Sequence, residues 1–259
     1  MKSKALALVA LVAVIGSIAA PADGALGDVI SSFPMSQARN IYRDVNYVYC
    51  VAGTNTLRQY TVNGSLVRTV SLPGLTNAGD ADHSPLGPAY FGVLERSNRI
   101  FEYRLVSGSF VRSRPVGAST VGYAHFPGSP YYYTHTGAQI YRYTLAGSMV
   151  GSFDVSYSAT VIAATGRFND AAGEFVLVAN RSTGRTTAYT GGGSIVRSFN
   201  VPGPAVGAVC GPGTGYTPKT TYWCAVPVGS DRFAYEIDLG NVNVAVEPAS
   251  WGSVKAVFR

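Results

Sequence analysis

Charged residues are scarce in this chain of 259 residues, where they make up 13% of the sequence and form no long runs. There are only three histidines and three cysteines, and none of them has the Cys-x-x-Cys or His/Cys spacing of a metal site. A glycine-rich phosphate loop, a nucleophile elbow and an HExxH motif are also missing. The sequence therefore gives no support to functions that depend on these motifs.

The chain has one long run of apolar and small residues, between positions 5 and 20, and it follows Lys2 and Lys4. This run is shorter than the roughly 20 residues of a membrane-spanning helix, so it predicts a secretory signal peptide over residues 1–22. The alternative is a retained membrane anchor. We expect a secreted protein, located outside the cell, in the periplasm or at the cell surface. Residues 23–259 are expected to form a single domain without a membrane span.

The excess of basic charge is small. The formal net charge of +6 falls to +4 when Lys2 and Lys4 leave with the signal peptide. A weakly basic chain with scattered charges is not typical of nucleic-acid-binding proteins, so no nucleic acid partner is expected. Acidic surfaces and polysaccharides stay open as partners.

A pattern of strand, tight glycine turn and strand occurs five times along the chain. It is first seen at residues 59–70, where Tyr60 precedes Asn63-Gly64. The corresponding tyrosines are 43, 40, 46 and 46 residues apart. They are Tyr60, Tyr103, Tyr143, Tyr189 and Tyr235. A period of about 40 to 50 residues with this content is typical of the blades of a β-propeller.

Each repeat divides into four short strands, and no stretch after residue 20 has the 3.6-residue apolar period of a helix. The sequence predicts an all-β fold with five full four-stranded repeats. Residues 27–34 resemble the fourth strand of a repeat and residues 251–259 resemble a first strand. We expect these two terminal strands to pair as a reduced sixth blade that closes the ring. The alternative is a five-bladed propeller with the terminal strands clasping it.

The cysteines suggest one disulfide bond. Cys210 and Cys224 flank a loop rich in glycine and proline, at residues 211–219, between two neighbouring predicted strands. Because a secreted protein meets an oxidising environment, we predict that these two residues are joined. The alternative is two buried thiols. Cys50 is expected to be buried in its strand.

Acidic and imidazole groups gather in the predicted first strands of the second and third repeats, which line the channel of a propeller. Asp82, His83 and His125 are candidates for acid and base catalysis at the channel mouth. Asp80 and Asp82 are candidates for binding Ca²⁺, and no other cofactor is expected. The alternative is that the Asp-x-Asp segment bonds its own backbone.

Two insertions, at residues 166–173 and 211–220, lengthen the fourth and fifth repeats at the same place. Loops at the same place in different repeats lie on one face of a propeller, so this loop-bearing face is expected to bind a protein or glycan. The candidate binding residues are Asp80, Arg167, Asp170, Tyr216 and Lys219.

The hairpins, such as residues 143–150 with their Tyr, Gly-Ser and hydrophobic positions, resemble those of secreted bacterial propellers with NHL and YVTN repeats. The resemblance spans residues 27–259. Among propellers of this kind, lactonases hold Ca²⁺ in the channel and streptogramin lyases use His and Glu, which implies an alternative function as a hydrolase or lyase at Asp82, His83 and His125. The fourth and fifth inner strands carry almost no acid or histidine. We therefore expect a non-catalytic binding or scaffold module for a protein, glycan or cell-surface partner.

Overall fold

The computed structural model describes residues 25–240, apart from positions 97, 118, 170 and 213–218. The predicted signal peptide and the predicted strand at 251–259 lie outside the described residues. Within them every regular element is a strand, which confirms the all-β prediction, and no helix there is long and apolar enough to cross a membrane.

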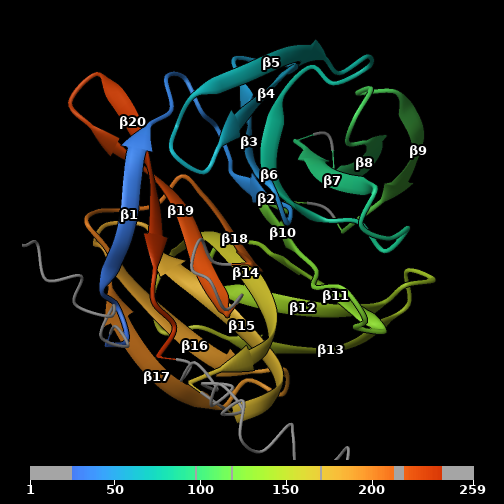
Figure 1. Ribbon diagram of the computed structural model, residues 1–259. Helices are drawn as coiled ribbons and strands as arrows, with labels where there is room; N and C mark the ends of the chain where they lie inside the picture. The colour runs from blue at the N-terminus through green and yellow to red at the C-terminus, as the bar shows by residue number, and fades with distance from the viewer. Residues whose placement is uncertain (1–24, 97, 118, 170, 213–218, 241–259) are drawn as a thin grey trace, which may run out of the picture.

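The described residues form twenty strands in five antiparallel four-stranded sheets, arranged as the blades of a propeller (Figure 1). From the inner to the outer strand, blade 1 consists of β2 (Tyr42–Arg43), β3 (Tyr47–Ala52), β4 (Thr56–Thr61) and β5 (Leu66–Ser71), and blade 2 consists of β6 (Ala78–His83), β7 (Tyr90–Glu95), β8 (Arg99–Arg104) and β9 (Phe110–Pro115). In the same order, blade 3 consists of β10 (Gly122–Ala124), β11 (Tyr131–His135), β12 (Gln139–Thr144) and β13 (Met149–Asp154), and blade 4 consists of β14 (Ala159–Phe168), β15 (Ala171–Asn180), β16 (Arg185–Thr190) and β17 (Ile195–Asn200). Blade 5 consists of β18 (Gly207–Pro212), β19 (Thr220–Val228), β20 (Asp231–Ile237) and, as its outer strand, β1 (Val29–Pro34).

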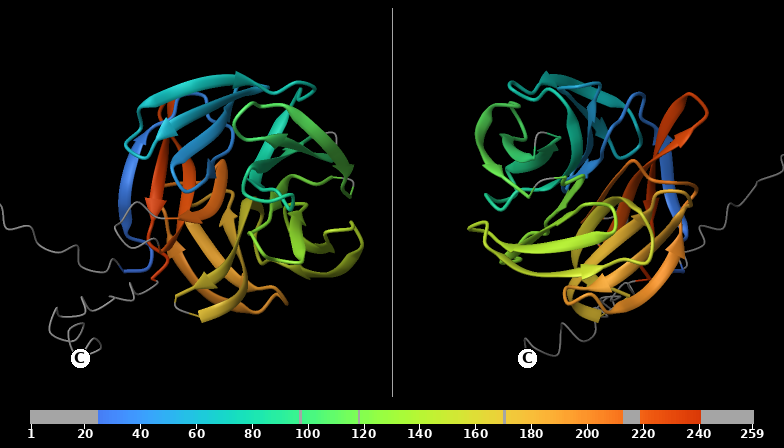
Figure 2. Two further views of the ribbon diagram at one scale, coloured as in Figure 1. Left: turned by 45° about the vertical axis from the view of Figure 1, so that its right-hand side comes forward. Right: turned by 180° about the vertical axis from the view of Figure 1, so that it is seen from behind.

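The N-terminal strand closes the ring as the outer strand of blade 5, and Figure 2 shows it beside the last strand. β1 pairs antiparallel with β20, with Ser32 opposite Tyr235. Phe33 is buried, and its ring lies 6.0 Å from that of Tyr60 in blade 1 and 6.5 Å from that of Trp223 in blade 5. The expected sixth blade is wrong. β1 fills the place of the fourth strand in the last repeat, so the described residues form five blades.

The recurring glycines of the outer hairpins are required by their backbone and by their neighbours. Gly64 and Gly193 have φ angles of +85° and +91°, which residues other than glycine rarely adopt. A Cβ atom on either would also lie 2.5 Å from a phenylalanine Cβ, that of Phe33 or Phe153 in the adjacent blade. The repeated turn therefore packs one blade against the next.

The first insertion forms a longer hairpin and no loop of its own. β14 and β15 continue outward until Phe168 lies opposite Ala171. Phe168 is fully buried and its ring lies 5.9 Å from that of Phe175. The extra residues at 166–173 therefore extend a sheet, because Phe168 gives them an apolar contact. Most of the second insertion, at 213–218, falls among the residues that are not described.

The three cysteines are free, buried thiols. Cys210 lies opposite Tyr222, and Cys224 lies opposite Ala208, so the two cysteines are offset by two positions on the paired strands β18 and β19. They are not joined in the structure, which agrees with the buried-thiol alternative, and the disulfide stays a prediction. Burial raises the pKa of the Cys50 thiol to about 12.

Candidate functional site

The carboxylate of Asp80 lies at the centre of the ring, on the buried inner strand β6. It accepts hydrogen bonds from the backbone N–H of Ile162 in blade 4, at 3.3 Å, and of Ala81, at 3.1 Å. The N–H groups of Ala208 in blade 5 and Tyr123 in blade 3 also stabilise its charged form. Burial nevertheless raises its pKa well above the usual range. Asp80 therefore joins the inner strands of four blades.

Asp82 has the same role two residues further along. Its carboxylate accepts the backbone N–H of His83, at 2.7 Å, and of His125 in blade 3, at 3.2 Å. The N–H of Ala164 in blade 4 also stabilises the charged form, while burial and the nearby Asp80 raise the pKa well above the usual range. The predicted bonding of the Asp-x-Asp segment to its own backbone is present, and bonds to other blades are added to it.

The surroundings of the two carboxylates do not suit the candidate Ca²⁺ site. Their oxygens face backbone N–H donors, which suit an anion and repel a cation. Among the described residues, no group of three or more His, Cys, Asp or Glu side chains is placed to hold a metal ion. We therefore derive no chemistry from Ca²⁺ at Asp80 and Asp82.

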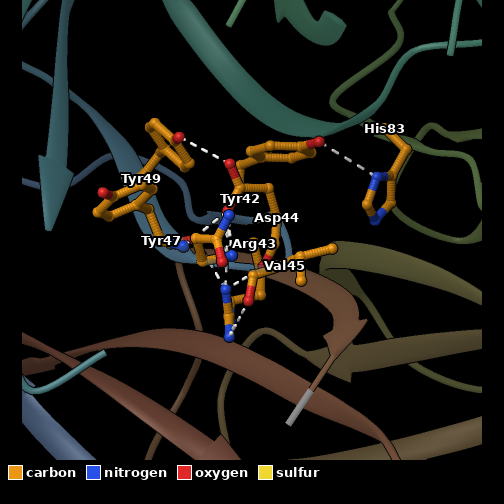
Figure 3. A network of polar contacts seen from close by, with 8 residues as sticks. Tyr42, Arg43, Asp44, Val45, Tyr47, Tyr49 and His83 are labelled. Carbon is orange, nitrogen blue, oxygen red and sulfur yellow. Dashed lines mark hydrogen bonds and ion pairs between the residues drawn. The ribbon is translucent and has the colours of Figure 1, made fainter. Parts of the chain in front are cut away.

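The imidazole of His83 is buried and both of its nitrogens have a partner, of which Figure 3 shows Tyr42. Its Nε2 lies 3.1 Å from the carbonyl oxygen of Cys210, so this nitrogen is the donor, and its Nδ1 lies 3.3 Å from the Tyr42 hydroxyl. Burial lowers the pKa of His83 to about 4. His83 is neutral in the folded protein and connects blades 1, 2 and 5.

A second network next to His83 fixes the β2–β3 turn. The buried guanidinium of Arg43 donates to the carbonyl oxygens of Asp44, Val45 and Tyr47 (Figure 3). It also lies 5.6 Å from the centre of the Trp223 ring. This arginine is therefore occupied by the fold and is not available to a ligand.

His125 lies in the same region, but within the described structure its imidazole is not hydrogen-bonded to the carboxylate of Asp82. Its Nε2 lies 3.4 Å from the carbonyl oxygen of Ser129, and its buried Nδ1 has no hydrogen-bond partner in the described structure. Burial lowers its pKa to about 4. Asp82 meets His83 and His125 through their backbone N–H groups, which gives the carboxylate a structural contact with both residues, and a catalytic role for the three stays a prediction.

Replacing His83 tests this neutral state through the pH dependence of stability. The imidazole is neutral in the folded protein and has a pKa of about 6.5 in an unfolded chain. Its contribution to the free energy of unfolding is therefore complete above pH 6.5 and is lost as the pH falls toward 4. The raised pKa values of Asp80 and Asp82 increase the free energy of unfolding as the pH falls. They do so in the wild type and in the His83→Gln variant alike, so their effect cancels in the difference between the two. We expect the difference in unfolding free energy between wild type and His83→Gln to shrink by about 2 kcal/mol from pH 7 to pH 4.5, measured by urea unfolding. A difference independent of pH would contradict a buried neutral His83.

The loop-bearing face contains a cavity of about 340 Å³, which we call the loop mouth. It lies at the C-terminal ends of the inner strands, and His83, Arg167 and Lys219 are part of its lining. The described ends of the two insertions, at 166–167, 211–212 and 219–220, therefore line the same cavity. The ammonium of Lys219 is paired with the buried carboxylate of Asp238 at 2.6 Å. Asp170 and Tyr216 belong to the residues that are not described.

The opposite face has a larger cavity, of about 650 Å³, at the N-terminal ends of the inner strands. We call it the arginine mouth because Arg39, Arg96 and Arg232 line it, together with Asp80. All five blades contribute to its lining. The remaining lining residues are Gln37, Gly53, Ala78, Gly79, Val121, Thr160, Val161, Val206 and Ser230.

The guanidinium groups of this mouth are little used by the fold. Those of Arg39 and Arg96 make no hydrogen bond or ion pair with any other residue that the structure describes. Arg232 donates one bond, to the carbonyl oxygen of Ala38. Burial lowers the pKa of Arg232, and the positive charge of Arg39 lowers it further. Like charges thus face one another across an open cavity, and Asp80, the acidic residue in its described lining, accepts backbone N–H groups of the inner strands.

The sequence did not indicate a ligand site at these arginines, because each comes from a different blade and none belongs to a motif. One signal was present: Arg96 directly follows the second strand of blade 2, and Arg181 directly follows that of blade 4. Equivalent places in the repeat thus carry the same residue type on the same face.

The chain is a β-propeller with five blades. No protein-family model matches its sequence and no curated protein matches it, so the resemblance to NHL and YVTN repeats stays a prediction. Among solved structures, a glutaminyl cyclase of Myxococcus xanthus matches over 83% of this chain and 97% of that chain, with a TM-score of 0.58 and 12% identity. A mitotic checkpoint complex gives a TM-score of 0.45, with 8% identity over 76% of this chain and 60% of that one. These likenesses concern the fold alone.

Proposed function

We propose that this protein is a secreted, non-catalytic binding module that takes an anionic ligand in the arginine mouth. The observation that carries the proposal is the set of guanidinium groups from Arg39, Arg96 and Arg232 around an open cavity of about 650 Å³, within the size range of ligand sites. A guanidinium presents paired N–H donors that match a carboxylate, sulfate or phosphate group. An anion between Arg39 and Arg232 would also relieve their mutual repulsion.

The non-catalytic part of the proposal is supported by how the candidate catalytic residues are used. Asp82 accepts backbone N–H groups of neighbouring strands, and the His83 imidazole is held between Cys210 and Tyr42. The alternative of a hydrolase or lyase at Asp82, His83 and His125 has the fold of the glutaminyl cyclase in its favour. Turnover of a glutaminyl peptide by the wild-type protein would contradict the non-catalytic proposal.

The binding proposal is tested by calorimetric titration with citrate, a small ligand with several carboxylates. The double variant Arg39→Gln/Arg232→Gln is expected to lower the association constant about tenfold, because each partly exposed charge pair contributes about 0.7 kcal/mol. The matched control is Arg99→Gln/Arg197→Gln, which removes the same charge from exposed positions on blades 2 and 4 and is expected to change binding less than twofold. Absence of citrate binding by the wild type, or equal losses in the two double variants, would overturn the proposal.

A further inference from the structure

The arginine mouth continues sideways into a second cavity of about 620 Å³. The two cavities share three lining residues, Arg96, Val121 and Thr160, so they form one continuous groove that runs from the axis over blades 2, 3 and 4. Arg181 lines the far part of this groove. Its exposed guanidinium makes no hydrogen bond or ion pair with another residue in the described part of the chain.

We propose that this groove binds an extended acidic polysaccharide whose sugar units carry carboxylates. The inference rests on the proposed function and names its ligand class. Four guanidinium groups, from Arg39, Arg96, Arg181 and Arg232, are spread along the groove, which suits a chain of repeated anionic groups better than one compact anion. Arginine in place of lysine favours forked contacts with planar carboxylates.

The groove between the arginines is lined by groups that suit sugar units. Thr160 belongs to the wall that the two cavities share, and its hydroxyl is buried. Val121, also shared, is 45% exposed and offers an apolar contact to the C–H face of a sugar ring. Side-chain hydroxyls in the second cavity are those of Ser119, Thr136 and Ser158, while the hydroxyl of Thr120 donates to the carbonyl oxygen of Gly117.

The backbone of this face is also under strain. Four described residues other than glycine have positive φ angles, and three of these, Gln37, Asn98 and Ser119, line the groove. Their φ angles are +61°, +64° and +62°. Such conformations cost about 1 kcal/mol or more each and gather at binding sites, where the surrounding structure holds them.

Two other classes of polyanion fit the lining less well. Single-stranded nucleic acid binds by stacking its bases on aromatic side chains, and no aromatic residue is among the described residues that line the two cavities. Peptides are usually held by an added strand or by apolar anchor pockets. The groove is formed by loops and strand ends, with Arg96 and Asn98 between β7 and β8 and Ser119 before β10, and it offers neither.

The test is a calorimetric titration with galacturonate and its oligomers up to the hexamer. We expect the association constant to rise at least tenfold from monomer to hexamer, and the fully methyl-esterified hexamer, which is uncharged, to lose that gain. Arg181→Gln is expected to weaken hexamer binding about fivefold and to change citrate binding less than twofold. Arg185→Gln, a nearby exposed arginine whose guanidinium contacts Ser198, is the matched control and is expected to have no effect.

The outcomes separate the two proposals. If citrate binds through Arg39 and Arg232 but hexamer binding neither exceeds monomer binding nor depends on Arg181, the polysaccharide inference is wrong and the proposed function stands. If hexaglutamate binds as tightly as the hexamer and with the same dependence on Arg181, the groove takes acidic peptides and the inference is overturned. If neither citrate nor any oligomer binds, the proposed function itself fails.

Discussion

Replacing Asp82 with alanine is expected to lower the free energy of unfolding by about 3 kcal/mol. The change leaves the backbone N–H groups of His83 and His125 without an acceptor in a site that water does not reach. An unsatisfied buried N–H costs about 1–3 kcal/mol, and the loss is partly offset because a costly buried carboxylate is also removed. The measurement is urea unfolding at neutral pH.

Two further variants make this prediction specific. Asp82→Asn keeps the shape and one acceptor but turns an amide donor toward a backbone donor, so it is expected to lose about 2 kcal/mol. Asp154→Ala removes an exposed aspartate that bonds only Gln139 among the described residues and is expected to stay within about 0.5 kcal/mol of the wild type. If Asp82→Ala is no less stable than Asp154→Ala, Asp82 does not hold the blades together and the catalytic alternative gains weight.

Replacing Gly207 with alanine is expected to cost about 3 kcal/mol. A Cβ atom at this position would lie 2.3 Å from Cα and 2.7 Å from the carbonyl carbon of Asn40, in the backbone of the neighbouring blade. That backbone cannot turn aside as a side chain does. Asn40 is fixed by bonds from its amide to the carbonyl oxygen of Gly79, at 2.7 Å, and from the N–H of Val51 to its amide oxygen, at 2.9 Å. The closest approach of blades 5 and 1 therefore allows only glycine.

Gly151 supplies the matched control for Gly207. It lies in the exposed outer strand β13, and a Cβ atom there would meet nothing within 4 Å. Gly151→Ala is expected to leave stability unchanged or to raise it by about 0.5 kcal/mol, because alanine has less freedom in the unfolded chain. Equal unfolding free energies for the two alanine variants would show that the ring tolerates separation of blades 1 and 5.

The repeat could be predicted from the sequence because it depends on residues that are close together in the chain. Gly64 and Gly193 are needed wherever the outer hairpin turns, and Tyr60 and its counterparts mark the packing between blades, so the pattern survives in every copy. The number of blades could not be predicted from such local patterns. It depends on the pairing of β1 with β20, which are about 200 residues apart, and a strand of the fourth type fits the last repeat as well as a blade of its own.

The site was less predictable than the fold. Asp80, Asp82 and His83 stand out in the sequence because they are adjacent, yet the structure uses them to join inner strands. The arginine mouth is built from side chains that are far apart in the chain, such as Arg39 and Arg232, and only closure of the ring brings them together. No spacing rule connects them.

The central claim is that the arginine mouth is the ligand site, and the most direct measurement locates the ligand on the protein. Side-chain Nε–H resonances of the arginines can be followed by NMR during titration with hexagalacturonate. The account predicts shifts for Arg39, Arg96, Arg181 and Arg232, with Arg185 and Arg197 unchanged. Shifts confined to Arg167, in the loop mouth on the opposite face, would contradict it.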